Sequence, residues 1–118
     1  MIAQETREHF LQQNIRMRLG HLASDLARIA NGINITGLNV AKNALEHSQA
    51  FIEWIAPDLL QDRFDDAARL VEIQRALTLW HSKWNRVQEN TDERTKLAIE
   101  ARAWSAEVLK MSGLLDQE

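Results

Sequence analysis

The chain has 118 residues, which is enough for one ordinary domain and too few for a catalytic domain with a separate binding domain. It contains no cysteine, which excludes disulfides, thiolate zinc sites and cysteine nucleophiles. Fourteen basic residues against seventeen acidic ones give a formal net charge of −3, so nucleic acid is not an expected partner. One proline, four glycines and no tyrosine favour helices over strands. We therefore predict an all-α protein with a single domain over residues 1–118.

The first predicted helix spans residues 6–30, where apolar side chains recur every three or four positions. It is followed by Asn31 and Gly32, a pair that predicts a left-handed C-cap. Ile33 and Ile35 in the connection that follows are expected to cover one end of the packed helices.

The second predicted helix spans residues 38–55 and ends before Pro57, because proline lacks a backbone N–H and disfavours helical geometry in the residue before it. The third spans residues 62–89 and begins at Asp62, which is a favourable N-cap residue. Its predicted core-facing stripe runs through Phe64, Ala67, Val71, Gln74, Leu77, Trp80 or His81, Trp84 and Val87, with support from Leu70 and Ile73.

The fourth predicted helix spans residues 92–112. Asn90, with Glu93 three residues later, has the arrangement of a capping box, and Gly113 supplies the C-cap. Four amphipathic helices with short connections predict an up-down antiparallel four-helix bundle. The first and third helices are longer than the other two, so their ends are expected to extend beyond the bundle and expose apolar surface.

That exposed surface and two further features predict a homodimer. Gly20 lies inside a helix, where glycine costs about 1 kcal/mol relative to alanine, so it indicates close approach of another helix or of a small ligand. Trp80 and Trp84 lie one turn apart, and they are open to three interpretations: core packing, a subunit interface or a ligand pocket. The predicted interface candidates are Phe10, Leu11, Gly20, Ala27, Trp80, Trp84 and Val87.

Sequence patterns for metal binding or catalysis are weak. The four histidines include no pair four residues apart, as the common helical zinc clamp requires, and no Glu-x-x-His motif of di-iron bundles. Glu5 with His9, and His21 with Asp25, share helix faces, and we interpret them as solvated surface pairs. The sequence contains neither a G-x-S-x-G elbow nor a glycine-rich phosphate loop. We therefore predict no metal ion and no cofactor.

Two short segments resemble the arginine–histidine motif of the HEPN superfamily, a group of small helical proteins that includes ribonucleases. The segments are Arg16-Met-Arg-Leu-Gly-His21 and Arg75-Ala-Leu-Thr-Leu-Trp-His81. Met17 and Ala76 stand where the family has a polar residue after the arginine. The resemblance implies that Arg75 binds phosphate and that His81 transfers a proton during metal-independent RNA cleavage in a dimer cleft.

The first functional hypothesis is a non-catalytic interaction or scaffold protein that self-associates and that has room for a further, unidentified protein partner. The cytoplasm is its expected compartment, because cysteine is absent and the first residues lack the features of a signal peptide. No membrane partner is expected, since the longest uncharged stretch is too short to cross a bilayer. The second hypothesis is a small-molecule or nucleotide-binding helical bundle, with HEPN-like ribonuclease activity as one form of it.

Overall fold

The computed structural model describes residues 4–33 and 37–116. Within these ranges the chain is helical and has no strand, so the all-α prediction is confirmed. The elements are α1 (Gln4–Gln12), α2 (Ile15–Gly32), α3 (Leu38–Leu59), α4 (Phe64–Ser82), α5 (Trp84–Glu89), α6 (Thr91–Ser112) and the short 3-10 helix η2 (Leu114–Asp116). Six α-helices in the described ranges replace the four predicted, because two of the predicted helices are each divided by a break.

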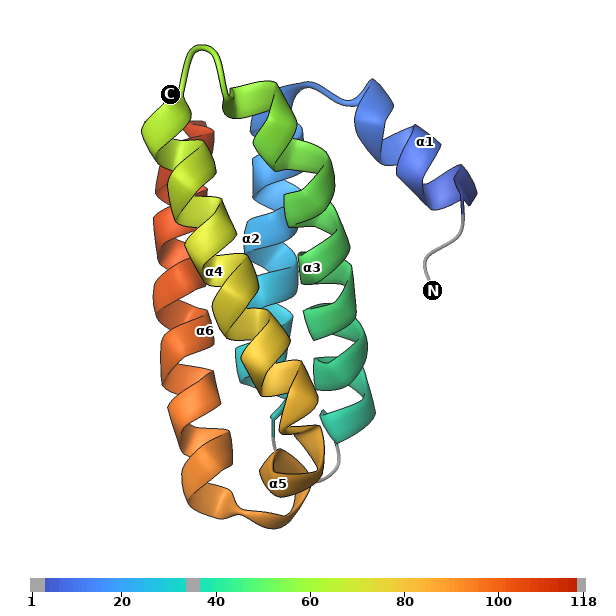
Figure 1. The fold of residues 1–118 in the computed structure, drawn as a ribbon, viewed down its shortest axis with the longest axis vertical. Coiled ribbons are helices and arrows are strands. Elements are labelled where there is room, and N and C mark those ends of the chain that lie inside the picture. Colours follow the sequence, from blue (N-terminus) through green and yellow to red (C-terminus); the bar gives the residue numbers. More distant parts are fainter. Residues whose placement is uncertain (1–3, 34–36, 117–118) are drawn as a thin grey trace.

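The long helices α2, α3, α4 and α6 lie side by side and alternate in direction along the chain (Figure 1). Helix α2 packs against both α3 and α6, and α4 packs against α3. Helix α1 projects from one end of this group beside α3, and α5 lies at the opposite end (Figure 1). The buried core that the structure describes is mainly aliphatic and also contains the aromatic side chains of Phe10, Phe51, Trp80, Trp84 and Trp104.

The single helix predicted over 6–30 is wrong, because the chain breaks between α1 and α2. Asn14 occupies the N-cap position of α2, and its side-chain oxygen accepts a hydrogen bond from the Met17 backbone N–H over 2.9 Å. The break lets α1 turn aside and bury Phe10, the one buried residue of that helix. Helical spacing continues through the break in the sequence, so the periodicity alone did not reveal it.

The helix predicted over 62–89 also breaks, at Lys83 between α4 and α5. The short α5 turns Trp84 and Val87 inward, where both are buried. The predicted overhanging ends are therefore wrong for these residues: α1 and α5 fold back and cover most of their apolar side chains. Leu11 is the exception, with 36% of its surface exposed.

Helix α3 continues through Pro57 to Leu59, so the end predicted at residue 55 is wrong. Proline removes the hydrogen bond of its own nitrogen and crowds the carbonyl of Glu53 one turn earlier. Ile55 and Leu59 on either side are both buried, and this packing holds the last turn in helical form. Asp62 is not the N-cap of the next helix. Helix α4 begins at Phe64, and its N-cap residue Arg63 makes no side-chain capping bond.

Of the signals predicted around α6, the Asn90 N-cap and the Gly113 C-cap are confirmed, while the reciprocal bond of a capping box is not among the contacts of the described residues. Asn90 accepts a hydrogen bond from the Glu93 backbone N–H over 3.1 Å, and Gly113 adopts a left-handed conformation with φ of 74°. The left-handed cap predicted after the first long helix is wrong, since α2 ends at Gly32 and the C-cap residue Ile33 is right-handed. A Cβ at Gly32 would lie 3.0 Å from the Gly37 carbonyl oxygen, so glycine there permits close backbone approach. Ile33 is buried, whereas Ile35 lies outside the described residues.

Polar contacts connect the long helices. Arg18 on α2 is buried and forms an ion pair with Asp58 near the end of α3, with 2.7 Å between Nη1 and Oδ2. Ser105 on α6 donates from Oγ to the backbone carbonyl oxygen of Ala23 on α2 over 2.7 Å. None of the helices in the described ranges combines the length and apolar character that a membrane crossing requires.

Candidate functional site

The structure separates the seven predicted interface candidates into three groups. Those buried inside the single chain are Phe10, Trp80, Trp84 and Val87. Leu11 is exposed, while Gly20 and Ala27 are half-buried. Four of these side chains therefore contribute to the core of one chain, and the interface role of the set remains a prediction.

Trp80 shows how the tryptophans are accommodated in the core. Its indole Nε1–H donates to Oε1 of Glu100 on α6 over 2.7 Å. The Nζ atom of Lys83 lies 4.5 Å from the centre of the same ring, in the geometry of a cation–π contact. The apolar body of the ring is thus buried while both of its polar contacts lie at the edge of the core.

Gly20 provides room for a side chain from the C-terminal segment. A Cβ at this position would lie 2.8 Å from Cδ1 of Leu114 in η2. Arg16, one turn earlier on α2, donates to the carbonyl oxygen of Gly113 over 2.7 Å. The presence of glycine at position 20 was attributed to close approach of either another helix or a small ligand. The structure supports close approach of a protein segment, and that segment is η2.

The HEPN-like candidates Arg75 and His81 lie in different surroundings. Arg75 is exposed and lines a groove between α3 and α4. His81 is half-buried, and its Nε2 lies 2.9 Å from Oε2 of Glu46 on α3. This contact lowers the pKa of Glu46, chiefly through the hydrogen bond with His81. The two residues have different neighbours, and the roles that the HEPN resemblance implies for them remain predictions.

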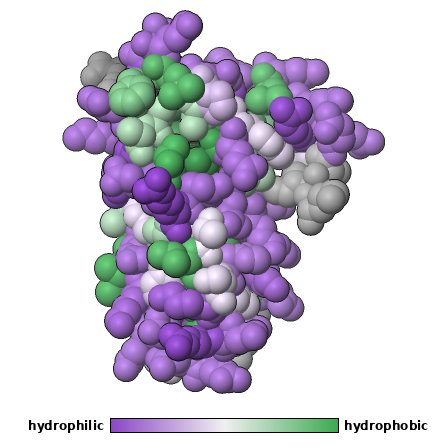
Figure 2. Space-filling model, viewed as in Figure 1, coloured by the Kyte–Doolittle hydropathy of each residue, from purple (hydrophilic) through white to green (hydrophobic). Residues whose placement is uncertain are grey.

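The groove beside Arg75 lies between α3 and α4 and has a mainly apolar lining. We call it the α3–α4 groove; it has a volume of about 640 Å³. Its apolar lining consists of Ala56, Pro57, Leu60, Phe64, Ala67, Ala68 and Val71, and its charged lining consists of Glu53, Glu72 and Arg75. Figure 2 shows apolar residues gathered over the end of α3 and the start of α4, at the upper left of the face in view.

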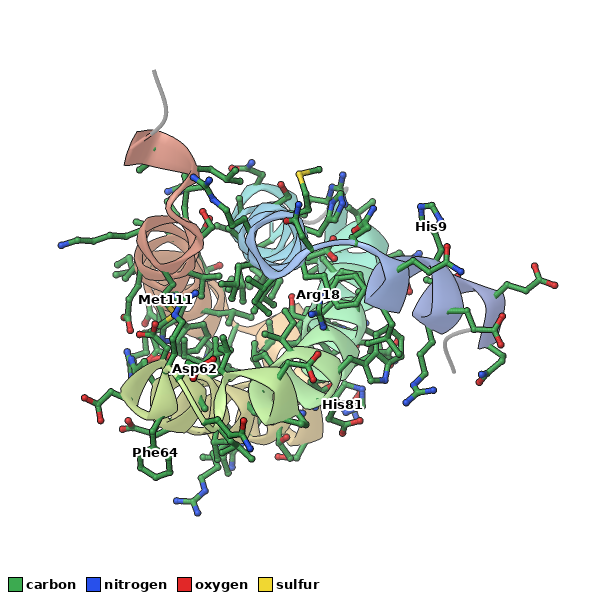
Figure 3. All side chains as sticks on the ribbon, turned by 90° about the horizontal axis from the view of Figure 1, so that it is seen from above. His9, Arg18, Asp62, Phe64, His81 and Met111 are labelled. Atoms are coloured by element: carbon green, nitrogen blue, oxygen red, sulfur yellow. The ribbon has the colours of Figure 1, made fainter. Side chains whose placement is uncertain are left out.

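Two residues predicted for the core lie on this surface instead. Phe64 is 62% exposed and Val71 is 43% exposed, so their assignment to the core-facing stripe is wrong. Figure 3 shows Phe64 pointing away from the other helices. The buried face of α4 consists of Ala67, Leu70, Ile73, Leu77 and Trp80. Helix α4 therefore carries apolar side chains on an inner and on an outer face, which is the sequence signal that could have identified this surface.

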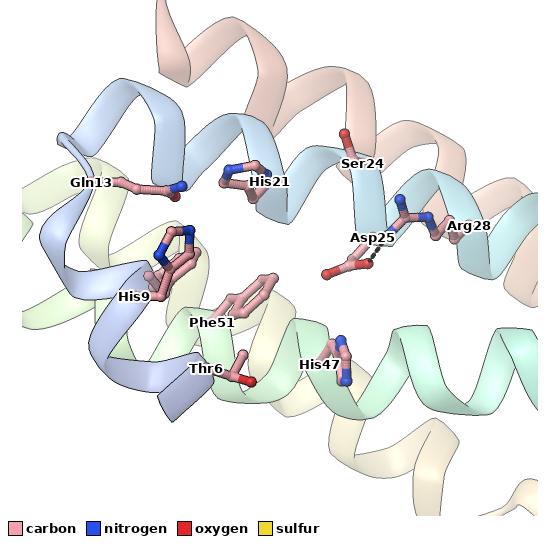
Figure 4. Close-up of a pocket in the computed structure, with 10 residues that line it drawn as sticks. Thr6, His9, Gln13, His21, Ser24, Asp25, Arg28, His47 and Phe51 are labelled. Atoms are coloured by element: carbon pink, nitrogen blue, oxygen red, sulfur yellow. Dashed lines mark hydrogen bonds and ion pairs between the residues drawn. The ribbon is translucent and has the colours of Figure 1, made fainter. Parts of the chain in front are cut away.

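A second depression lies beneath α1, and we call it the α1 pocket. Side chains of α1, α2 and α3 line its volume of about 280 Å³. Figure 4 shows Asp25 on α2 facing His47 and Phe51 on α3, with α1 to one side of them. The interpretation of Asp25 as half of a solvated surface pair is wrong, since the residue is only 3% exposed and its Oδ1 accepts a hydrogen bond from Arg28 Nη1 over 2.8 Å.

The electrostatics of the α1 pocket are dominated by this buried carboxyl. Burial raises the pKa of Asp25, and the neighbouring charges of Arg28, His47 and His21 oppose that rise without cancelling it. Three histidines line the pocket: His9, His21 and His47. In the part of the chain that the structure describes, no three histidine or acidic side chains are grouped closely enough to hold a metal ion.

Comparison of the chain with protein-family models, with curated proteins and with solved structures finds no match.

Proposed function

We propose that the protein is a non-catalytic interaction module that forms a homodimer through the outer face of α4 and the α3–α4 groove. The observation that carries this proposal is the exposed Phe64 ring beside an apolar groove on the same helix. A large aromatic side chain in water beside further apolar surface is a typical anchor of a protein interface. The occupant that we propose is a second copy of the chain.

The shape of the surface supports a two-fold contact. In such a contact the same surface of both subunits is used, so it must hold both a projection and a matching depression. Phe64 projects from α4, while Ala56, Leu60 and Ala68 help to form the depression next to it. If two copies of α4 cross antiparallel near Ala68, the phenyl ring of each copy lies against the Val71 region of the other. The small Ala68 side chain allows the two helices to approach closely.

The charges along α4 favour the same antiparallel arrangement. Its start is acidic, with Asp65 in the first turn and Asp62 just before it, and both residues are exposed. Arg75 is exposed in the second half of the helix. An antiparallel crossing near Ala68 places the acidic start of one copy beside both Glu72 and Arg75 of the other, so Arg75 offsets the repulsion from Glu72. The same crossing aligns the two helix dipoles favourably. A parallel crossing would place like charges together.

None of the seven interface candidates predicted from the sequence lines the α3–α4 groove, so the proposed dimer surface differs from the one predicted. The expected bundle and compartment fit within the proposal. We interpret α2, α3, α4 and α6 as an up-down four-helix bundle, to which α1 and α5 are added at opposite ends. A bundle of this kind presents a rigid helical face for self-association and leaves other faces for an unidentified protein partner. The cytoplasm remains the proposed compartment, in keeping with the absence of cysteine.

Sedimentation equilibrium over a range of protein concentrations tests the proposal. We expect the wild type to be a dimer that dissociates on dilution, and Phe64→Asp to weaken dimerisation at least tenfold. Ile99→Asp is the matched control, because Ile99 is 64% exposed but lies on α6. It should dimerise like the wild type. A wild type that stays monomeric, or equal weakening by both substitutions, would contradict the proposal.

A further inference from the structure

We propose that the α1 pocket binds a small organic cation, with a protonated amine held by the carboxylate of Asp25. This site is separate from the dimer surface in its residues and in its chemistry: it lies between α1, α2 and α3, and it is centred on a buried charge. The inference therefore does not depend on self-association.

The carboxylate of Asp25 is nearly inaccessible yet only partly satisfied. Its Oδ1 accepts one hydrogen bond from Arg28, and among the described residues no donor is bonded to Oδ2. An ionised carboxylate can accept about four hydrogen bonds, so acceptor capacity remains on the pocket side. Arg28 has 64% of its side chain in solvent, so its charge is shared with water and compensates the buried carboxylate only in part.

A second acceptor in the pocket also lacks a donor. Oε1 of Gln13 is buried and has no hydrogen-bond partner among the described residues. Gln13 lines the same pocket as Asp25. Gln13 and Asp25 are twelve residues apart along the start of α2, about 18 Å at 1.5 Å per residue, so an ammonium group at Asp25 does not reach this oxygen (Figure 4). The contact that we propose for the ammonium group is therefore with Asp25 alone.

The apolar part of the pocket favours the same class of ligand. Phe10 and Phe51 both line the pocket and stack on each other, with ring centroids 4.3 Å apart. Aromatic faces attract organic cations and also accommodate an apolar substituent on the amine. The volume of about 280 Å³ lies near the lower end for ligand pockets, which limits the ligand to a small amine.

Other ionisable side chains share the α1 pocket with Asp25. Arg28 and His21 on α2 and His47 on α3 interact electrostatically with Asp25, and His9 on α1 lines the same pocket. An anionic ligand would be repelled by the carboxylate of Asp25. The pocket should therefore prefer an amine over a carboxylate of the same shape.

Titration of the full chain with three probes of one shape tests the inference. The probes are benzylammonium, neutral benzyl alcohol and anionic benzoate, followed at pH 8 by calorimetry and by amide chemical shifts. We expect benzylammonium to bind with a Kd of about 1 mM or below and to shift the resonances of Asp25 and Phe51. The other two probes should bind at least tenfold more weakly. Absence of binding, or equal binding of benzoate or benzyl alcohol, would overturn the inference.

Two substitutions test whether the charge of Asp25 is responsible for benzylammonium binding. Asp25→Asn keeps the shape and removes the charge, and it should weaken benzylammonium binding at least tenfold. Asp66→Asn is the matched control, because Asp66 also pairs with an arginine three residues away but lies on α4. It should leave the affinity unchanged. Retained affinity in Asp25→Asn would overturn the inference, and the probe series on the wild type decides the question if that variant does not fold.

Discussion

The Phe10 ring on α1 stacks on the Phe51 ring on α3, with centroids 4.3 Å apart and planes inclined by 8°. Trp54 lies beside both, at 5.7 Å from Phe10 and 5.8 Å from Phe51. Since Phe10 is the one buried residue of α1, this stack is the main apolar attachment of the helix. The position of α1, and with it the cover of the α1 pocket, depends on that contact.

Phe10→Ala should release α1 while leaving the four long helices folded. Burying a phenylalanine side chain contributes about 1.5–3 kcal/mol, so the free energy of unfolding should fall by an amount in that range. Hydrogen exchange of the α1 amides should become faster, because their protection requires the docked helix. Amides in the middle of α3 should keep their slow exchange.

Leu11→Ala is the control for Phe10→Ala, because Leu11 neighbours Phe10 on α1 but is 36% exposed. Its effect on the free energy of unfolding should stay within about 0.5 kcal/mol. Unchanged protection of α1 in Phe10→Ala would show that other contacts hold this helix.

Alanine at Gly20 and at Gly32 should have opposite effects in urea unfolding. Gly20→Ala should raise the free energy of unfolding by up to about 1 kcal/mol, because helix propensity improves and the nearby Leu114 Cδ1 is the movable end of a side chain. Gly32→Ala should lower it by about 1–3 kcal/mol, because the added Cβ meets backbone atoms of Gly37 and Ala41.

The contact between Gly20 and Leu114 can be isolated with a double variant. In a Leu114→Ala background the obstacle is removed, so Gly20→Ala should be more stabilising there than in the wild type. If Gly20→Ala raised the free energy of unfolding more in the wild-type background than in the Leu114→Ala background, the close approach of η2 to α2 would be contradicted.

The buried carboxyl of Asp25 should make stability depend on pH. Burial raises the pKa of Asp25, so the folded chain keeps this proton to a higher pH than the unfolded chain does. Above the raised pKa, the ionised carboxylate of Asp25 therefore lowers the free energy of unfolding. As the pH falls from the raised pKa to the ordinary aspartate pKa, this decrease in the free energy of unfolding disappears. Arg28, His47 and His21 reduce the decrease but do not reverse it.

Asp25→Asn should consequently be more stable than the wild type at pH 7, and the difference should shrink toward the ordinary aspartate pKa of about 3.9. Urea unfolding of both chains across this pH range measures it. If the variant is less stable at pH 7, the ionised carboxylate is a net stabilising group, and the destabilisation inferred from its burial is wrong.

The fold was predictable wherever the signals were local. Asn90 marks the start of α6 because its side chain caps the helix, and Gly113 marks the end because glycine adopts a left-handed conformation easily. Both residues were identified from the sequence. The breaks near Asn14 and Lys83 were missed because helical spacing runs through them. Asn14 is a strong N-cap residue, but the choice to begin a new helix there depends on the distant contact of Phe10 with Phe51.

The candidate sites were less predictable than the fold. Phe64 and Val71 have helical spacing relative to the core residues, and periodicity cannot tell which of two apolar faces of α4 points inward. His21 and Asp25 were correctly placed on one face of a helix, but their surroundings depend on where α1 folds back. The α3–α4 groove and the α1 pocket each form where different helices meet. Local sequence patterns do not show which helices meet or which of their faces are in contact.

Formation of a disulfide at Ala68 tests the proposed dimer most directly. The chain has no cysteine, so Ala68→Cys introduces a single thiol near the proposed two-fold axis, and Ala103→Cys introduces one at an exposed position on α6. Under mild oxidation at a concentration where the dimer forms, Ala68→Cys should give a covalent dimer rapidly, because the two thiols face each other. Ala103→Cys should remain largely monomeric. Equal cross-linking of the two variants, or none at Ala68→Cys, would contradict self-association through the outer face of α4.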